Sequence, residues 1–316
     1  MSPESASRHP RVILHFGPPK TGTSALQAWC AVNRALLARH RVYYAGFDNA
    51  EDPKHQWLLR EFRQARFDRL AAEVAARPDG TLVLSCEGVL VHRATFPVEA
   101  WPRFRAALGG AAAHLFLVQR DPLGWTRSLW KQGILNPPQA GRIPVPDPER
   151  FGRQRWLAEM TALPDLASRL AKECGAEGTM IAAYEGDWLA AFRSLAQLPD
   201  DPGFLPLTLV NDSAPDDLIA LYRSLAVGEP DVSELRLVLF ACFCRAEPTA
   251  NLMLRSVARR FAAQPQAMQA RQLDHLAARL AGTTGLSGGP DKASDLPSRL
   301  AGVLADRRAN LSAARG

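Results

Sequence analysis

The sequence predicts an α/β fold with a mostly parallel central sheet of about five strands, followed by a helical C-terminal portion. Five short apolar runs are separated by stretches whose apolar residues recur at helical spacing. This order of elements indicates βαβ units, in which helices cover both faces of the sheet. After about residue 205 only the helical spacing continues.

The expected strands are runs of apolar residues that end at polar residues or at turns. In chain order they are 12–16, 41–46, 81–85, 114–118 and 179–184. A helix is expected from the first strand to about Leu37, and residues 55–76 have the spacing of a further helical stretch. Ligands bind at the carboxyl ends of such strands, so the residues just past each strand are the first candidates for a site.

The C-terminal portion has helical spacing in three stretches, 218–225, 235–242 and 273–280. Residues 282–297 are rich in Gly, Ser, Thr and Pro, which indicates a flexible linker. We therefore expect one α/β domain over 1–281, helical from about 205, and a linker with a short helix over 282–316. The proline-rich stretch 136–148 is expected to be a long loop, either a lid near the strand ends or a surface excursion.

Composition and charge limit the classes of ligand and the compartment expected for the chain. Its 316 residues carry a formal net charge of +6, which favours anionic ligands, but the Lys and Arg are scattered, which argues against nucleic acid. Five cysteines without a Cys-x-x-Cys pair favour core packing in a reducing compartment over metal ligation. Residues 1–10 lack an apolar signal core, and the longest apolar run, 237–244, is too short to span a bilayer. We expect a cytoplasmic protein without a membrane span.

The most informative stretch is the turn after the first strand, GPPKTGTS over residues 17–24. Amides that open a helix lack intrahelical acceptors and carry partial positive charge, so a phosphate-like group can accept their hydrogen bonds. Lys20 adds a full charge and precedes Gly22, whereas the common nucleoside-triphosphate loop has its lysine after the second glycine. The alternative is an ordinary strand–turn–helix corner capped by Thr and Ser.

A second informative stretch follows the fourth strand. Arg120 comes directly after the apolar run, Asp121 and Pro122 suit the start of a helix, and Ser128 lies about two turns into it. The planar fork of arginine matches phosphate oxygens, and a serine hydroxyl adds a donor. The alternative is a capped turn with a surface arginine.

Together these stretches resemble the sulfotransferase family. HFGPPKTGTSALQ, residues 15–27, resembles the 5'-phosphosulfate loop of its bacterial branch, and Arg-Asp-Pro followed by Ser resembles its 3'-phosphate motif. The resemblance implies a P-loop nucleotide-kinase-like three-layer fold. It also implies 3'-phosphoadenosine 5'-phosphosulfate (PAPS) as donor, adenosine 3',5'-bisphosphate (PAP) as product, and no metal ion. It assigns the 3'-phosphate to Arg120 and Ser128, and the phosphosulfate to Pro19, Lys20, Thr21, Gly22, Thr23 and Ser24.

The same resemblance suggests catalytic residues. Lys20 would donate to the bridging oxygen as the sulfur–oxygen bond breaks. Glu87 follows the third strand, and Ser-Cys-Glu there is similar to a Ser-x-Glu of bacterial sulfotransferases, so Glu87 is the expected base. Because the phenol type of the family uses a histidine as base, His55 is the second candidate after Glu87, and His92 is a further candidate. Glu87 as a plain helix-start carboxylate is the alternative, and His15 on the first strand is expected to be a core or crevice histidine.

Weaker similarities lie in Tyr184-Glu185 and in Asn211-Asp-Ser213. A late Arg-x-Gly segment of the cytosolic type is missing, so either Arg255, Arg259 or Arg260 substitutes for it or the chain follows the bacterial pattern.

We therefore expect a PAPS-dependent sulfotransferase that acts on an acceptor hydroxyl, with a glycan, a lipid and a small metabolite all open. Two alternatives stand beside it. One is a small-molecule kinase with Asp121 as metal-binding carboxylate, and the other is a non-catalytic nucleotide-binding protein. The oligomeric state stays open.

Overall fold

A computed structural model describes residues 10–49, 52–135, 147–207, 214–229, 232–247, 252–281 and 296–313. By their contacts the residues fall into two compact units, 1–126 with 152–210 and 127–151 with 211–316, which we call unit 1 and unit 2. The expectation of one domain over 1–281 stays a prediction. Within unit 2 the helices past residue 215 pack on one another.

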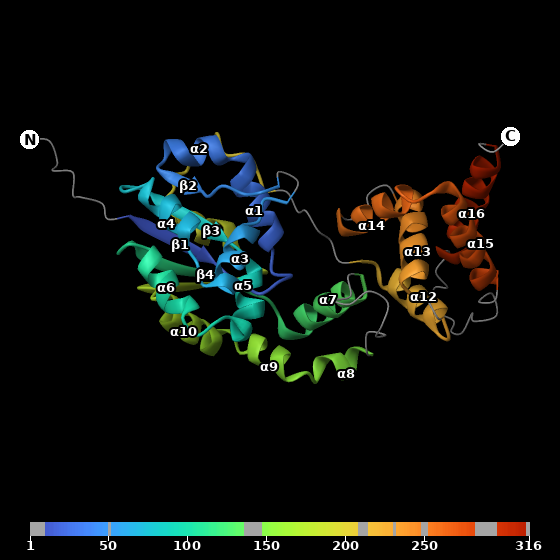
Figure 1. The fold of residues 1–316 in the computed structure, drawn as a ribbon, viewed down its shortest axis with the longest axis horizontal. Helices are drawn as coiled ribbons and strands as arrows, with labels where there is room; N and C mark the ends of the chain where they lie inside the picture. Colours follow the sequence, from blue (N-terminus) through green and yellow to red (C-terminus); the bar gives the residue numbers. More distant parts are fainter. Residues whose placement is uncertain are drawn as a thin grey trace, which may run out of the picture. The chain divides into compact units, whose positions relative to one another are not determined.

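Unit 1 is built on a five-stranded sheet in which every strand pair is parallel (Figure 1). The strands are β1 (Arg11–His15), β2 (Val42–Tyr44), β3 (Thr81–Ser85), β4 (Ala112–Gln119) and β5 (Gly178–Ala183), in the spatial order β2-β3-β1-β4-β5. This confirms the predicted α/β class and the parallel sheet, and it is compatible with a nucleotide-kinase-like layered fold.

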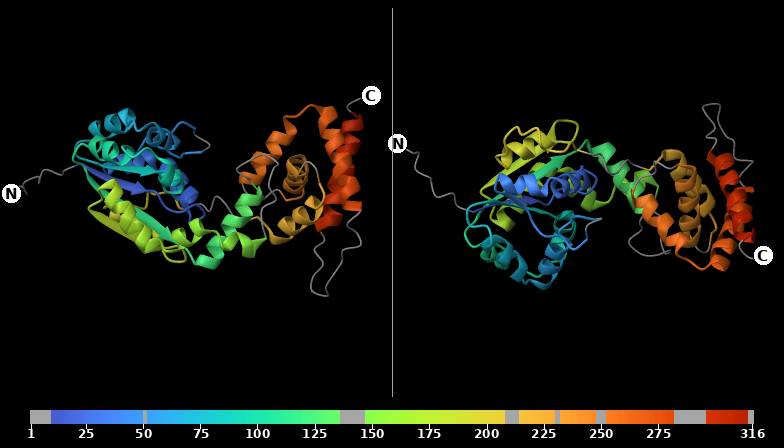
Figure 2. Two further views of the ribbon diagram at one scale, coloured as in Figure 1. Left: turned by 60° about the horizontal axis from the view of Figure 1, so that its bottom comes forward. Right: turned by 90° about the horizontal axis from the view of Figure 1, so that it is seen from above.

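Helices cover the sheet on both faces (Figure 2). They are α1 (Thr23–Val32), α2 (Arg34–Arg39), α3 (Gln56–Gln64), α4 (Asp68–Ala75), α5 (Glu87–His92), the 3₁₀ turn η1 (Arg93–Thr95), α6 (Ala100–Ala107), α9 (Arg155–Thr161), α10 (Leu163–Cys174) and α11 (Trp188–Leu195). Two more helices, α7 (Pro122–Leu135) and α8 (Pro148–Gly152), run across the division between the units.

Alternation along β1 shows why two layers of helices are needed. Val12 and Leu14 belong to a buried cluster with residues of α3, α4, α6 and α10, whereas Ile13 belongs to a second cluster with residues of α1, α2 and α11. A strand whose successive side chains are all buried must be covered on both faces.

The stretch 55–76, expected to be one helical region, forms two helices, α3 and α4. They are separated at Ala65, which ends α3 in the left-handed conformation at φ 48°. The bend brings Phe67 edge-on against Phe62, with ring centroids 5.0 Å apart, in an aromatic cluster that includes Phe104. An alanine at positive φ is held there by this packing, and nothing in its own side chain signals it.

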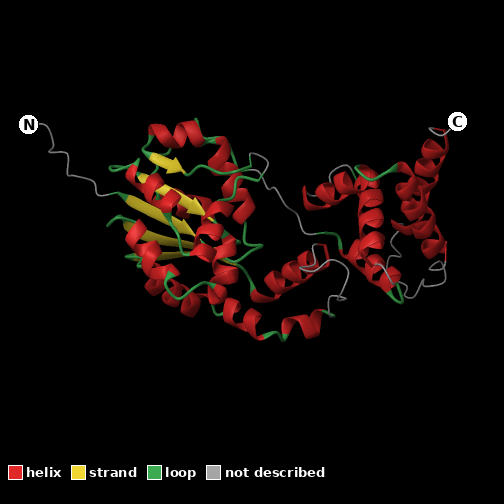
Figure 3. Ribbon diagram, in the orientation of Figure 1, coloured by secondary structure: helices red, strands yellow, loops and turns green. Residues whose placement is uncertain are grey.

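Unit 2 includes the helices α12 (Asp216–Ala226), α13 (Val232–Ala246), α14 (Leu252–Ala262), α15 (Gln266–Ala281) and α16 (Leu296–Ala313) (Figure 3). The other four pack on α13, whose residues 238–243 are all buried. Helices that are apolar all round need such a central position. Most of the expected linker 282–297, most of the expected loop 136–148 and Asn211-Asp-Ser213 lie outside the described residues, and residues 296–297 belong to α16. In the described part of the chain, no helix has both the length and the apolarity to cross a membrane.

Candidate functional site

The carboxyl ends of the strands in unit 1 bring the predicted motifs to one edge of the sheet. His15 at the end of β1 pairs with Ser85 at the end of β3, so the turn after β1 and Glu87 after β3 leave the sheet at the same level. From β1 the chain proceeds to β2 on one side, and from β4 it proceeds to β5 on the other. β1 and β4 therefore flank the point where the strand order reverses, which is where open α/β sheets bind ligands.

The turn after β1, residues 16–22, bends through two residues with positive φ, and at Gly22 a side chain would also be crowded. Lys20 has φ 67° and Gly22 has φ 84°, both in the left-handed region. A Cβ at Gly22 would lie 3.1 Å from Cζ2 of Trp188 on α11. On the other side, the indole Nε1 of Trp125 donates to the carbonyl of Pro19 at 2.8 Å. The turn is therefore tied down between two tryptophans, which fixes the direction of its amides.

The start of α1 presents unpaired donors. Gly22 precedes this helix without a side-chain cap, and within the described residues the amides of Gly22, Thr23 and Ser24 donate no hydrogen bond. The hydroxyls of Thr21 and Thr23, expected to serve a ligand, instead lie 2.7 and 3.4 Å from the carbonyl of Pro18. Backbone amides, rather than these two hydroxyls, are the donors that this conformation leaves for an anion.

Arg120 reaches this turn from β4. Its Nη1 donates to the carbonyl of Lys20 at 3.3 Å, and its guanidinium lies 4.7 Å from the ring centroid of Tyr184. Tyr184 follows β5, and its backbone amide donates a hydrogen bond to the carbonyl of Gln119 at 2.7 Å. The two predicted motifs thus meet in space, although 100 residues separate Lys20 from Arg120.

Asp121 has a structural task. Its Oδ2 accepts the amide of Gly124 at 2.7 Å, which caps the start of α7 as the sequence suggested. Ser128, further along the same helix, is only 3 % exposed and belongs by its contacts to unit 2.

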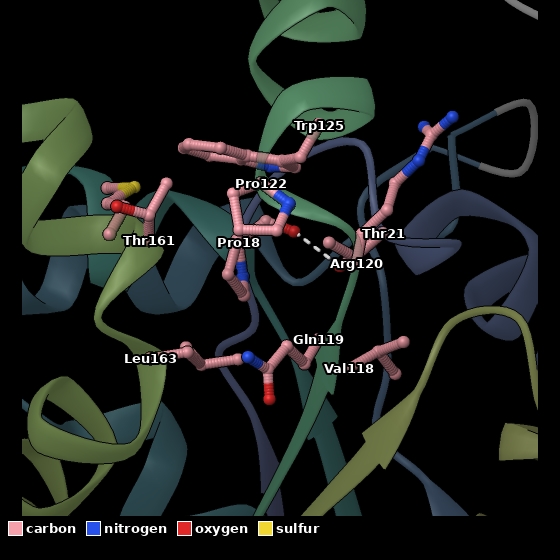
Figure 4. A pocket seen from close by; sticks show the side chains of 10 residues that line it. Pro18, Thr21, Val118, Gln119, Arg120, Pro122, Trp125, Thr161 and Leu163 are labelled. Atoms are coloured by element: carbon pink, nitrogen blue, oxygen red, sulfur yellow. Dashed lines mark hydrogen bonds between the residues drawn. The ribbon is translucent and has the colours of Figure 1, made fainter.

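A small pocket opens beside the turn (Figure 4). Pro18, Thr21 and Pro122 line it together with Trp125, and Leu163 of α10 closes it on the far side. Arg120 also lines this pocket, but its guanidinium points away from the other labelled side chains in the close view. The pocket is mostly apolar, which suits the body of a ligand better than its charged end.

A buried polar network lies under the turn. Ser85 Oγ lies 2.8 Å from Nδ1 of His15 and accepts from Nε2 of Gln27 at 2.9 Å. Burial lowers the pKa of His15 to about 3, so its ring is neutral at neutral pH. Ser85 can donate its proton to Nδ1, or accept one from it beside the bond from Gln27, since a hydroxyl has one proton and two lone pairs.

The outer nitrogen of His15 faces the turn without a partner. His15 Nε2 is fully buried and has no hydrogen bond among the described residues. A Cβ at Gly17 would lie 3.3 Å from it and 3.8 Å from the hydroxyl oxygen of Thr21. His15 was expected to be a satisfied core or crevice histidine, but only one side of its ring is satisfied. A buried ring nitrogen without a partner beneath unpaired amides points to a ligand in the turn, and with its proton on Nε2 the ring would donate to an anion there.

Glu87 opens α5 directly after β3 and forms an ion pair. The Nζ of Lys54 lies 3.5 Å from Oε1 of Glu87 and 3.6 Å from Oδ1 of Asp52. Burial lowers the pKa of Lys54, but these two carboxylates outweigh it and hold the pKa above its usual value. The side chains of Lys54 and Glu87 are 22 and 21 % exposed, so the pair is shielded but reachable.

His55 is fastened to the sheet by both ring nitrogens. Its Nδ1 accepts the amide of Ser85 at 2.7 Å, and its Nε2 donates to the carbonyl of Ala45 at 3.2 Å. Burial lowers its pKa to about 4. The ring therefore has no lone pair left for an acceptor's proton, and the geometry favours Glu87 over His55 as a base. His92 ends α5 and is half-buried.

Sequence reasoning missed Lys54, Gln27 and the hub position of Ser85. A lysine before a helix and a glutamine in an apolar helix are common, so neither carries a local signal. Comparisons with family models, with curated proteins and with solved structures find no match to this chain.

We predict that Gly22→Ala damages the site more than a matched glycine change elsewhere. Gly109 also has positive φ, at 59°, but a Cβ there would meet nothing within 4 Å. Both variants should lose about 1 kcal/mol of unfolding free energy to the left-handed backbone, and Gly22→Ala about 1–3 kcal/mol more from overpacking against Trp188. Urea denaturation measures both, and equal losses would contradict the packing described for the turn.

We predict that unit 1 loses stability as pH falls below about 6.5. The folded pKa values of His15 and His55, about 3 and about 4, lie below the unfolded value, so the unfolded chain binds more protons in this range. At pH 5 each histidine should cost about 2 kcal/mol relative to pH 7. Urea unfolding of His55→Gln should depend less on pH than that of the parent or of His92→Gln. A pH dependence unchanged in His55→Gln would contradict the assignment.

Proposed function

We propose that this chain is a sulfotransferase that moves a sulfuryl group from PAPS to an acceptor hydroxyl. The observation that carries the proposal is the contact of Arg120 with the carbonyl of Lys20 at the reversal of strand order. It joins the two stretches that resemble the 5'-phosphosulfate loop and the 3'-phosphate motif of sulfotransferases into one candidate binding edge.

The residues present fit such a donor. The unpaired amides of Gly22, Thr23 and Ser24 suit the phosphosulfate, and His15 adds a donor beneath them in the tautomer that carries the proton on Nε2. Arg120 stacks on Tyr184 and offers its fork to the 3'-phosphate. The part of Ser128 in that phosphate site stays a prediction from the sequence. When bound, PAPS would supply the activated sulfuryl group.

Lys20 is proposed to stabilise the leaving phosphate. It holds a proton at Nζ that it can offer to the oxygen that departs with the nucleotide, where negative charge develops in the transition state. The kinase alternative would use Asp121 for a metal ion, but the Oδ2 of Asp121 is engaged with the amide of Gly124. This engagement supports the sulfotransferase proposal over the kinase alternative.

Glu87 is proposed to act as the base. A carboxylate oxygen of Glu87 accepts the proton of the acceptor hydroxyl as the acceptor oxygen bonds to sulfur. The sulfur–oxygen bridge breaks at the same time, and its electron pair stays with the phosphate oxygen that Lys20 serves. The partly exposed position of Glu87 beside Lys54, at the same edge as the turn, supports this role. The acceptor class, whether glycan, lipid or small metabolite, is left to assay.

The test combines binding and turnover in matched variants. Calorimetry should show that adenosine 3',5'-bisphosphate binds more tightly than ATP with magnesium. Lys20→Met should abolish transfer in a folded protein, because the leaving oxygen loses its proton donor. Glu87→Gln should keep bisphosphate affinity but lose about 100-fold or more in kcat. Lys172→Met, at an exposed lysine of α10, is the control and should match the parent.

Two outcomes would count against the proposal. Tighter binding of ATP with magnesium, together with phosphoryl transfer, would indicate the kinase. Bisphosphate binding without turnover over a broad panel of acceptors would indicate a non-catalytic nucleotide-binding protein.

A further inference from the structure

We propose that Lys54 is a positioning residue that holds the carboxylate of Glu87 beside a fixed positive charge and orients it for proton transfer from the acceptor. This inference rests on the proposed function, and it concerns a residue that the sequence motifs do not include. The pair joins residues 33 positions apart in the chain, and the ammonium lies 3.5 Å from the carboxylate oxygen.

The backbone holds Lys54 firmly from both sides. The carbonyl of Pro53 accepts the hydroxyl of Tyr44 at 2.6 Å, and the amide of His55 donates to the carbonyl of Ser85 at 3.1 Å. The two ring nitrogens of His55 form further hydrogen bonds, one with the amide of Ser85 and one with the carbonyl of Ala45. Four hydrogen bonds thus fasten the segment 53–55 to the ends of β2 and β3. The buried His55 acts as the anchor that places its neighbour Lys54 beside Glu87.

Asp52 explains how Lys54 can stay charged through a turnover. Lys54 lies between two carboxylates, with Asp52 at 3.6 Å. When Glu87 accepts a proton and becomes neutral, Asp52 still balances the ammonium. Lys54 therefore does not have to lose its proton when Glu87 gains one. The ammonium is still charged when Glu87 gives up its proton again before the next turnover.

None of the other described groups near Glu87 supplies a positive charge as close as that of Lys54. Among the described residues, Lys54 is the cation found within 4 Å of Glu87. Burial raises the pKa of the neighbouring Cys86 thiol to about 12, so the thiol stays neutral. His92 at the end of α5 has its pKa lowered by burial and by the charge of Arg63 on α3, which packs against α5.

The first experiment compares pH profiles of kcat/KM for the parent, Lys54→Met, Lys54→Arg and the control Lys172→Met. Removing a cation that lies 3.5 Å from the proton-accepting carboxylate should move the acidic limb of Lys54→Met to higher pH. Lys54→Arg keeps the charge and should restore the limb to within a few tenths of a unit. Affinity for adenosine 3',5'-bisphosphate should stay within about twofold of the parent in all four proteins, since Lys54 lies outside the turn.

Two results would overturn the role of Lys54. One is an acidic limb of Lys54→Met that superimposes on that of the parent. The other is a Lys54→Arg limb as displaced as that of Lys54→Met. A purely structural lysine would lower thermal stability in Lys54→Met without moving the limb, so the pH profile separates the two roles.

A second measurement does not depend on turnover. Carbon NMR of the lysine side chains follows the titration of Lys54, identified by its absence in Lys54→Arg. In Glu87→Gln one of the two carboxylates that offset burial is gone, so the pKa of Lys54 should fall. An unchanged titration would show that the pair does not couple and would overturn the inference. If the parent binds no bisphosphate and transfers no sulfuryl group, the proposed function itself fails, which is a different outcome from turnover with an unshifted limb.

Discussion

The position of β1 in the middle of the parallel sheet is the constraint on which the rest of the site depends. Hydrogen bonds to β3 on one side and β4 on the other fix the level at which β1 ends. The turn that follows has to bend over the end of its own strand before α1 begins, and Gly22 and Lys20 adopt left-handed conformations to do so. The uncapped start of α1 then faces the edge where Arg120, Glu87 and Tyr184 emerge from the neighbouring strands.

Ser85 forms hydrogen bonds with two histidines, of which one supports the fold and the other lies at the candidate site. Its backbone amide and carbonyl form hydrogen bonds with His55, and its hydroxyl forms hydrogen bonds with His15 and Gln27. His55 is satisfied at both nitrogens and serves the fold. His15 is satisfied on one side only, and its free side lies under the turn. Since an unpaired buried polar group is costly to a folded protein, its position under a turn that could bind a ligand gives it a functional explanation.

Much of unit 1 could be predicted from the sequence because buried parallel strands are continuous apolar runs, and all five expected strands form. The meeting of the turn with Arg120 could also be anticipated, since parallel strands share an edge. The helix break at Ala65 could not, because its left-handed backbone is imposed by the packing of Phe62 and Phe67. The pair of Lys54 with Glu87 escaped notice because ion pairs between distant residues leave no local pattern. His55 was a candidate base on residue type alone, and only its two backbone partners show it to be an anchor.

The central claim is that one edge of the sheet binds a nucleotide with phosphates at both ends, the turn after β1 at one end and Arg120 at the other. A crystal structure of the protein soaked with adenosine 3',5'-bisphosphate tests it most directly. We expect the 5'-phosphate on the amides of Gly22, Thr23 and Ser24, and the 3'-phosphate on the guanidinium of Arg120. Density for the nucleotide at another place, or an edge left without it at saturating concentration, would contradict the account.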